Sequence, residues 1–223
     1  LVDFFKAAKE NDIKAILGCE IYVVPKSMHI KQPDKENSTY HLVLLVKNEI
    51  GYKNLMKIAS IASIEGFYYK PRVDCDYLRK HSEGLIALSA CLGGEVQSHL
   101  LRDNYEKAKE TALKYKEIFN GDFYLELQDH GMEEQKKVNE GNIKLSEETG
   151  IPLIVTNDVH YINKEDSNYT KNKIENIILK LKSMSIVHDM LYNQKDDEIV
   201  SLKEFFSKRS EERRVGKECL RLC

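Results

Sequence analysis

Strand and helix patterns alternate along the first two-thirds of this chain, and that alternation limits the folds it can adopt. Apolar runs predict strands at 13–24, 40–46, 84–90, 122–128 and 152–156. Apolar residues at helical spacing predict helices at 2–12, 49–62, 104–119 and 133–149, with a further helix after Gly94. Such alternation is typical of an α/β fold in which helices cover a parallel sheet or barrel. The strands are too few to close an eight-stranded barrel.

Composition and charge exclude several classes of protein. With 42% hydrophobic and 31% charged residues, the 223-residue chain is predicted to be globular rather than disordered. A formal net charge of −2 provides no overall basic field for binding nucleic acid, although bound metal could serve a phosphate-handling site. No apolar run is long enough to span a bilayer.

The cysteines and the first residues indicate the setting of the chain. Five cysteines are scattered along it, with no CxxC pair and no disulfide-like spacing. This pattern predicts a reducing, cytoplasmic setting and no disulfide partner. The chain opens on Leu1 inside an amphipathic helical pattern, which favours a fragment.

Asp158 and His160 follow the last predicted strand and are separated by one residue. In an extended chain, residues two apart point to the same side, so this carboxylate and imidazole would face one place. Such a pair suits zinc, manganese or iron. For these two residues alone, a capping aspartate and a surface histidine is an equally good interpretation.

Other residue types that bind metals also border the predicted strands. Glu20 closes the first strand, His41 opens the second, Cys91 follows the third and His130 follows the fourth. Taken singly, each fits an ordinary role: a solvated carboxylate, a satisfied structural histidine, a small buried residue or a turn residue. Their recurrence at strand ends favours a site for two or three divalent ions that activate water and neutralise a phosphate.

Six motifs in a fixed order carry a family resemblance. They read GCEIYV at 18–23, YHLVLL at 40–45, EGFYYKPR at 65–72, GLIALSACL at 84–92, FYLELQDHG at 123–131 and TNDVHY at 156–161. The segments KN at 47–48 and GYKNL at 51–55 belong with the second motif. Together they resemble the amino-terminal PHP (polymerase and histidinol phosphatase) domain of bacterial replicative DNA polymerase III alpha subunits. The resemblance extends from residue 1 to about 166.

The resemblance implies a distorted (β/α)7 barrel with a multinuclear site for divalent ions (Zn, Mn or Mg) at the strand ends. In some members that site has 3′–5′ exonuclease or related phosphoesterase activity, and in others it is a structural module. The parent protein would replicate DNA, with DNA and replisome subunits as partners. No catalytic residue is assigned by the resemblance. Carried over by motif, the implied metal ligands are Glu20, His41, Cys91, His130, Asp158 and His160.

The chain departs from the family pattern before the first helix and after the last motif. The family's His-x-His strand and Thr-Asp-His-Gly turn are absent, so a partial barrel lacking its first strand or strands is expected. Several ligands would be missing as well, and we expect no unaided nuclease activity. The polymerase palm, fingers and thumb are also absent, so the chain is not expected to polymerise DNA.

The last quarter of the chain follows neither the motifs nor the barrel pattern. Residues 167–208 are predicted to be a helical segment of unrelated origin. Within it, 174–206 weakly resembles the dimerisation helices of sensor histidine kinases, with His188 not the phospho-acceptor; an ordinary amphipathic helix is an equally good interpretation. Residues 209–223 resemble neither family and are predicted to be an artefactual or disordered tail.

Three functional hypotheses remain open from the sequence. The first is the polymerase-associated phosphoesterase domain, which requires the ligands to converge. The second is a free-standing small-molecule phosphatase of the same superfamily, which would not need the GYKNL and GFYYKPR segments. The third is a catalytically silent structural module, which predicts little or no metal uptake.

Overall fold

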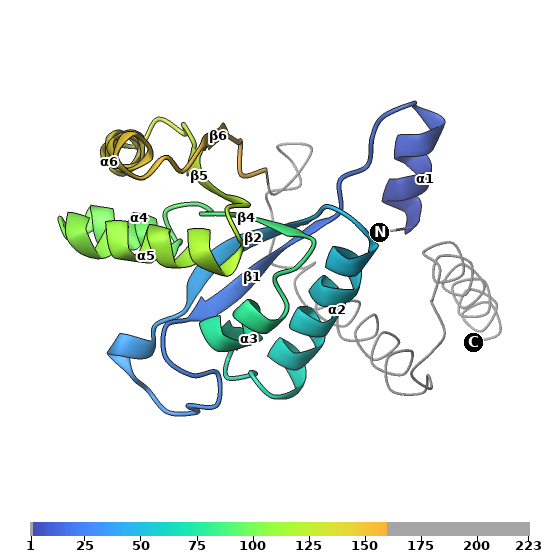
Figure 1. The fold of residues 1–223 in the computed structure, drawn as a ribbon, viewed down its shortest axis with the longest axis horizontal. Coiled ribbons are helices and arrows are strands. Elements are labelled where there is room, and N and C mark those ends of the chain that lie inside the picture. Colours follow the sequence, from blue (N-terminus) through green and yellow to red (C-terminus); the bar gives the residue numbers. More distant parts are fainter. Residues whose placement is uncertain (1, 160–223) are drawn as a thin grey trace, which may run out of the picture. The chain divides into compact units, whose positions relative to one another are not determined.

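A computed structural model describes residues 2–159 of the chain (Figure 1). The described residues fall into two compact units, the first holding residues 2–17 and the second residues 18–159. The predictions for His160, for the helical segment at 167–208 and for the 209–223 tail lie outside the described residues.

Helix α1 (Val2–Glu10) is the described element of the first unit. Asp3 lies in its first turn and Lys9 in its last, which suits the helix dipole. The helix ends two residues earlier than predicted, and Asp12 beyond it adopts a left-handed backbone with φ of 53°.

The second unit is built on a six-stranded sheet in the order β3-β1-β2-β4-β5-β6. Strand β2 is antiparallel to both of its neighbours, β1 and β4, and every other pair is parallel. The sheet is open, as expected for a partial barrel. Its strands are β1 (Gly18–Val24), β2 (Tyr40–Val46), β3 (Arg72–Asp74), β4 (Leu85–Leu88), β5 (Phe123–Leu127) and β6 (Leu153–Val155).

The expectation of a parallel sheet was wrong for β2. A parallel neighbour needs a long crossover, usually a helix, whereas the segment between β1 and β2 contains only the short 3₁₀ helix η1 (Lys35–Asn37). The chain therefore returns beside β1 in the opposite direction. The first strand also begins at Gly18 rather than at residue 13, and Glu20 is its third residue rather than its last.

Five helices cover this sheet, and one of them was not predicted. The short helix α3 (Cys75–Lys80) and strand β3 before it lie in a stretch for which the sequence predicted no helix or strand. Asn48, Asp74 and Asn104 cap the amino ends of α2, α3 and α5 with their side chains. The helices are α2 (Glu49–Ile64), α3 (Cys75–Lys80), α4 (Glu95–Leu101), α5 (Tyr105–Ile118) and α6 (Glu133–Thr149).

The core lies between the sheet and these helices. Helix α2 packs on β2, β3 and β4, while α4 and α5 pack on each other (Figure 1). No helix within residues 2–159 combines the length and the apolar character needed to cross a membrane. The largest side chains that are fully buried are Phe123, Leu42, Leu44, Ile58, Leu78, Leu85, Leu125, Leu145 and Ile151.

The segment from 25 to 39, for which the sequence predicted no helix or strand, is anchored in the core. Met28 is 4% exposed, and its backbone N–H donates to the Asp74 carboxylate at 3.1 Å. Asn37 is also buried; its side chain accepts from the Lys26 backbone N–H and donates to the Ser27 carbonyl. The loop therefore has a fixed shape beside the sheet.

Candidate metal centre

Three of the predicted ligands meet on one face of the β1–β2 pair. Glu20 on β1, His41 on β2 and Cys91 after β4 each place one ligand atom within 4.8 Å of the others. A Glu20 carboxylate oxygen lies 3.2 Å from Nδ1 of His41, and the Cys91 sulfur lies 3.5 Å from the same nitrogen. Within residues 2–159 these three residues form the candidate metal group, called the Glu20–His41–Cys91 cluster below.

The register of the hairpin explains why Glu20 and His41 meet. Tyr22 on β1 lies directly opposite His41 on β2, and side chains opposite each other share a face. Glu20 is two residues before Tyr22, so it points to that face too. The opposite face carries Ile21 and Leu42, which are buried in the core. The core therefore fixes the register, and the register brings the two ligands together.

The turn after β4 delivers Cys91 to the cluster. Its Gly94 N–H donates to the Cys91 carbonyl at 2.8 Å, and its Gly93 carbonyl accepts from the His41 N–H at 2.9 Å. A Cβ on Gly93 would lie 3.1 Å from Nδ1 of His41, which is tighter than ordinary contact. The glycine therefore lets the turn lie against the imidazole.

A ring contact fixes the plane of the His41 imidazole. The Tyr22 ring lies edge-on to it, with centroids 5.2 Å apart and planes at 80°. The Nζ atom of Lys70 in turn lies 4.3 Å from the centroid of the Tyr22 ring. The Tyr22 ring therefore contacts both the Lys70 amine and the His41 imidazole, which would bind the metal ion.

Glu126 on β5 is a functional candidate that the sequence predictions missed. It is 4% exposed, and one carboxylate oxygen accepts from the backbone N–H of Ala90, the residue before Cys91. The other oxygen accepts from the Thr156 hydroxyl at 2.7 Å, two residues before Asp158. The carboxylate therefore joins the two turns that carry predicted ligands.

The Ala90 backbone shows how tightly the first of these turns is held. Ala90 has φ of 65°, a left-handed conformation that costs a non-glycine residue energy and persists where neighbours impose it. Besides Glu126, the Gln97 side chain on α4 holds the turn by donating to the Ser89 hydroxyl and to the Ala90 carbonyl. One signal in the sequence could have revealed Glu126, since it is a charged residue in the middle of an otherwise apolar strand.

His130 and Asp158 lie at the β5 and β6 side of the site, and their ligand atoms are not part of the three-residue cluster. His130 is exposed, and its Nε2 donates to the Asn157 carbonyl at 3.0 Å. That bond is the main reason why the pKa of His130 is raised, and the Asp158 charge adds to it. The Gln135 side chain also hydrogen-bonds this imidazole and raises its pKa. Asp158 has a left-handed backbone with φ of 47°.

The carboxylates of Glu20 and Asp158 raise the pKa values of groups that lie near them in the site. Burial raises the pKa of the Cys91 thiol, and the charges of Asp158 and Glu20 raise it further. Burial also raises the pKa of the Glu126 carboxyl, to which Asp158 again contributes. Asp158 is therefore close enough to act on both groups. Among the described residues, Cys19, Cys75 and Cys91 form no disulfide, so no such bond blocks the Cys91 sulfur.

The donor set fits a divalent cation. Carboxylate, imidazole and thiolate atoms within 4.8 Å of one another match the ligand types of zinc and manganese sites. A cation there would favour the deprotonated thiol and offset the nearby carboxylates. Nothing in this donor set selects one metal over another.

The comparison with known families decides where the chain belongs. The PHP domain family matches residues 1–130, more than half of the chain. The chain belongs to the PHP domain family. The resemblance on which the sequence interpretation rested is thus confirmed, and the open α/β sheet is consistent with a partial PHP barrel.

Curated relatives of this PHP domain are named DNA polymerase III subunit alpha. The chain is 50% identical over 167 residues to the protein from Borreliella burgdorferi and 49% identical over 170 residues to that from Treponema pallidum. These matches cover 74% of the chain but only 15% and 14% of the relatives. The protein from Thermus aquaticus is 38% identical over 190 residues, covering 84% of the chain and 15% of that relative.

Proposed function

We propose that this chain is the PHP part of a DNA polymerase III alpha subunit and hydrolyses phosphodiesters there with bound divalent metal. The Glu20–His41–Cys91 cluster is the observation that carries the proposal. Because the relatives are named DNA polymerase III subunit alpha, the proposal places the chain in DNA replication in the cytoplasm, with DNA and replisome subunits as partners. Within that context we propose 3′–5′ exonuclease chemistry, completed by ligands from outside the described residues.

Each residue of the centre has a separate role in this proposal. Glu20, His41 and Cys91 hold a cation, and His130, Asp158 and His160 extend the ligand set. The chemistry supplied by a divalent cation is activation of water and neutralisation of phosphate charge. The Tyr22 ring and Gly93 orient the imidazole of His41, and Glu126 positions the two ligand-bearing turns. Positioning bonds of this kind tune metal affinity in other sites.

Metal uptake tests the proposal directly. We expect the chain to bind Mn²⁺ or Zn²⁺ in calorimetry, and Cys91→Ser or His41→Ala to weaken the affinity by at least about a hundredfold, because loss of a residue that only orients a ligand already costs tenfold to a hundredfold. Cys19→Ser is the matched control, because Cys19 is next to Glu20 but points away from the cluster face. Equal uptake by wild type and by the Cys91 and His41 variants would reject the ligand assignment.

The proposal also predicts how uptake depends on pH. The Cys91 thiol must lose its proton to bind metal, and burial raises its pKa. Metal affinity is therefore expected to keep rising with pH through the alkaline range, by about tenfold per unit for each proton released. Cys91→Ser should flatten the profile. A chain that takes up no metal at any pH would instead support the silent structural module.

A further inference from the structure

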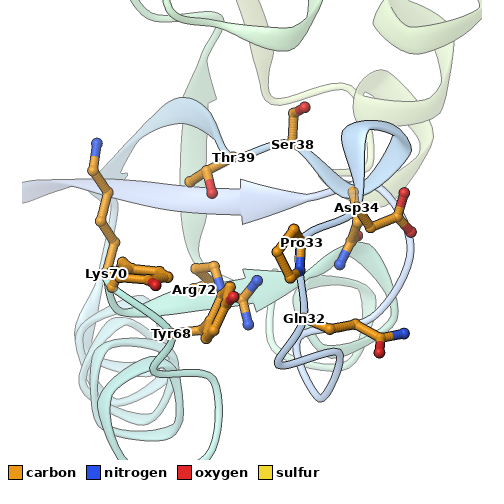
Figure 2. Close-up of a pocket in the computed structure, with 10 residues that line it drawn as sticks. Gln32, Pro33, Asp34, Ser38, Thr39, Tyr68, Lys70 and Arg72 are labelled. Atoms are coloured by element: carbon orange, nitrogen blue, oxygen red, sulfur yellow. The ribbon is translucent and has the colours of Figure 1, made fainter.

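A second site-like feature is connected to the cluster through Lys70, which lines it and contacts the Tyr22 ring. It is a hollow of about 620 Å³ between the 25–39 loop and the turn that leads into β3 (Figure 2). Its volume is within the range of pockets for small ligands. Figure 2 shows Tyr68 and Arg72 side by side and facing Pro33, with Ser38 and Thr39 beyond. It is called the Tyr68–Arg72 hollow below.

Arg72 gives the hollow a fixed wall and a positive charge. Its guanidinium is buried and donates only to backbone carbonyls, those of Gly66, Met28 and Ile30. These bonds tie the two loops together, so the hollow is largely preformed. Among residues 2–159 Arg72 makes no ion pair, and its charge is not cancelled by a carboxylate.

Two lysines add to this positive charge. Lys31 donates to the carbonyls of Glu65 and Phe67, and Lys70 stacks on Tyr22; neither makes an ion pair within the described part of the chain. The one carboxylate in the lining, Asp34, already pairs with Lys26 at 3.1 Å. The hollow therefore favours an anion, and the Thr39 hydroxyl can donate to it.

Aromatic rings border the same hollow. Tyr69 is 85% exposed and has φ of 58°, an energetically costly conformation for a tyrosine. Tyr68 lies edge-on to it at 4.6 Å between centroids, and the Arg72 guanidinium lies over the Tyr68 ring. The Tyr69 ring is therefore exposed, its backbone conformation is costly, and Arg72 and Lys70 beside it make no ion pair among the described residues. These features together suit a flat, anionic ligand.

Lys70 connects this hollow with the metal centre. It lines the hollow, yet its amine extends to the Tyr22 ring, whose edge contacts His41. Figure 2 shows the Lys70 side chain extending away from Arg72. A polyanionic chain that lies in the hollow and touches the Lys70 amine therefore extends toward the Glu20–His41–Cys91 cluster.

From this geometry we propose that the Tyr68–Arg72 hollow binds a nucleotide of single-stranded nucleic acid. The base stacks on Tyr69, a phosphate binds beside Lys70, and the adjoining phosphodiester lies toward the metal cluster. The assignment of the hollow as a substrate subsite rests on the proposed function. Binding of the strand itself depends only on the hollow.

The test measures binding of a fluorescein-labelled oligothymidylate of about eight nucleotides by anisotropy, in EDTA and at several salt concentrations. Tyr69→Ala is expected to weaken binding about tenfold, whereas Tyr69→Phe keeps the ring and stays within about twofold. Lys70→Ala is expected to make the slope of log K against log salt shallower by about 0.7. Both side chains are exposed, so the fold is retained.

Lys144→Ala is the matched control, because Lys144 stacks on the Tyr105 ring at 4.2 Å just as Lys70 stacks on Tyr22 at 4.3 Å. It should leave both affinity and salt slope unchanged. Equal losses in the Lys70 and Lys144 variants, or full competition by equimolar inorganic phosphate, would overturn the nucleotide site. Metal uptake by the same proteins separates the two proposals. A chain that binds the strand through Tyr69 and Lys70 but takes up no metal refutes only the proposed function.

Discussion

Glu95 on α4 and Glu126 on β5 are both almost fully buried, at 5% and 4% exposure. Among the described residues, only Glu95 of these two is paired with a cation. The Glu95 carboxylate accepts from the Lys114 amine at 3.1 Å and from the Tyr115 hydroxyl at 2.7 Å. Burial and this carboxylate raise the pKa of Tyr115 well above its ordinary value, so it remains a donor. Glu95 thus has a cation of its own.

Glu126 has no such cation among the described residues. Its partners are neutral, namely the Ala90 backbone N–H, the Thr156 hydroxyl and the Gln128 side chain. The charged group that acts on it is another carboxylate, Asp158. Burying a carboxylate without a cation is costly. The comparison teaches that Glu95 is a completed structural pair, whereas Glu126 belongs to an excess of negative charge that a metal ion would balance.

The largest expected effect is on the structural pair. Glu95→Leu leaves the Tyr115 hydroxyl buried without its acceptor and Lys114 without its partner, so the free energy of unfolding should fall by about 3 kcal/mol. Urea denaturation in EDTA measures it. Glu110→Gln, which removes an exposed partner of Lys107, should leave the curve unchanged. A loss at Glu95 no larger than at Glu110 would break the comparison.

The second effect concerns metal and distinguishes the two glutamates. At a hundredfold excess over Kd, Mn²⁺ or Zn²⁺ should raise the unfolding free energy of wild type by about 2.7 kcal/mol. Glu95→Leu should gain the same increment, because its pair is separate from the cluster. Glu126→Leu should gain about 1.4 kcal/mol less, since the turn that carries Cys91 loses its anchor. Equal increments in both variants would assign Glu126 no part in the metal site.

A smaller effect is expected on the metal-free stability at Glu126. Glu126→Leu leaves one buried N–H and one hydroxyl without an acceptor but also removes a desolvated carboxylate, so the net loss should be about 1–2 kcal/mol. Glu126→Gln keeps an oxygen for Ala90, and the Thr156 hydroxyl can turn to accept from the new amide. Its unfolding free energy should therefore lie between those of wild type and Glu126→Leu in the same urea titration.

The smallest effect is the dependence of stability on pH. Burial raises the folded-state pKa of Glu126 above its ordinary value of 4.5, so the folded chain binds this proton more tightly than the unfolded chain does. The stabilisation of the folded chain by this tighter proton binding is fully present below pH 4.5. It is lost as the pH rises through the folded-state pKa of Glu126. Its slope stays below about 1.4 kcal/mol per pH unit. Glu126→Gln should remove it from metal-free stability profiles, and an unchanged profile would contradict the assignment.

Much of this architecture could be predicted from the sequence because apolar periodicity reports burial directly. The strand at 40–46 and the helix at 133–149 were predicted with the bounds that the structure gives, and the others differ mainly at their ends. The direction of β2 was missed, since periodicity does not distinguish parallel from antiparallel pairing. The short elements β3 and α3 were missed because three buried residues and six helical ones give too little periodicity.

The candidate site was predictable where a residue type has a well-known chemical role. Glu20, His41 and Cys91 were proposed as ligands and the fold gathers them, although their metal binding stays a prediction. Glu126 was missed because its role depends on which turns flank it in space. The Tyr68–Arg72 hollow was missed for the same reason, since its walls are separated by about thirty residues of chain.

The Glu20–His41–Cys91 cluster joins the β1–β2 hairpin to the distant turn after β4, so an ion bound there would affect the stability of both. Glu20 and His41 come from one local hairpin, whereas Cys91 arrives from 50 residues beyond His41. An ion bound by all three would link the hairpin to the turn in the folded chain only, and would stabilise the fold because the separated ligands of the unfolded chain do not bind it. Removing the ion with a chelator would then loosen the 89–94 segment first. Faster hydrogen exchange of its backbone amides would show that the ion has left the Glu20–His41–Cys91 cluster.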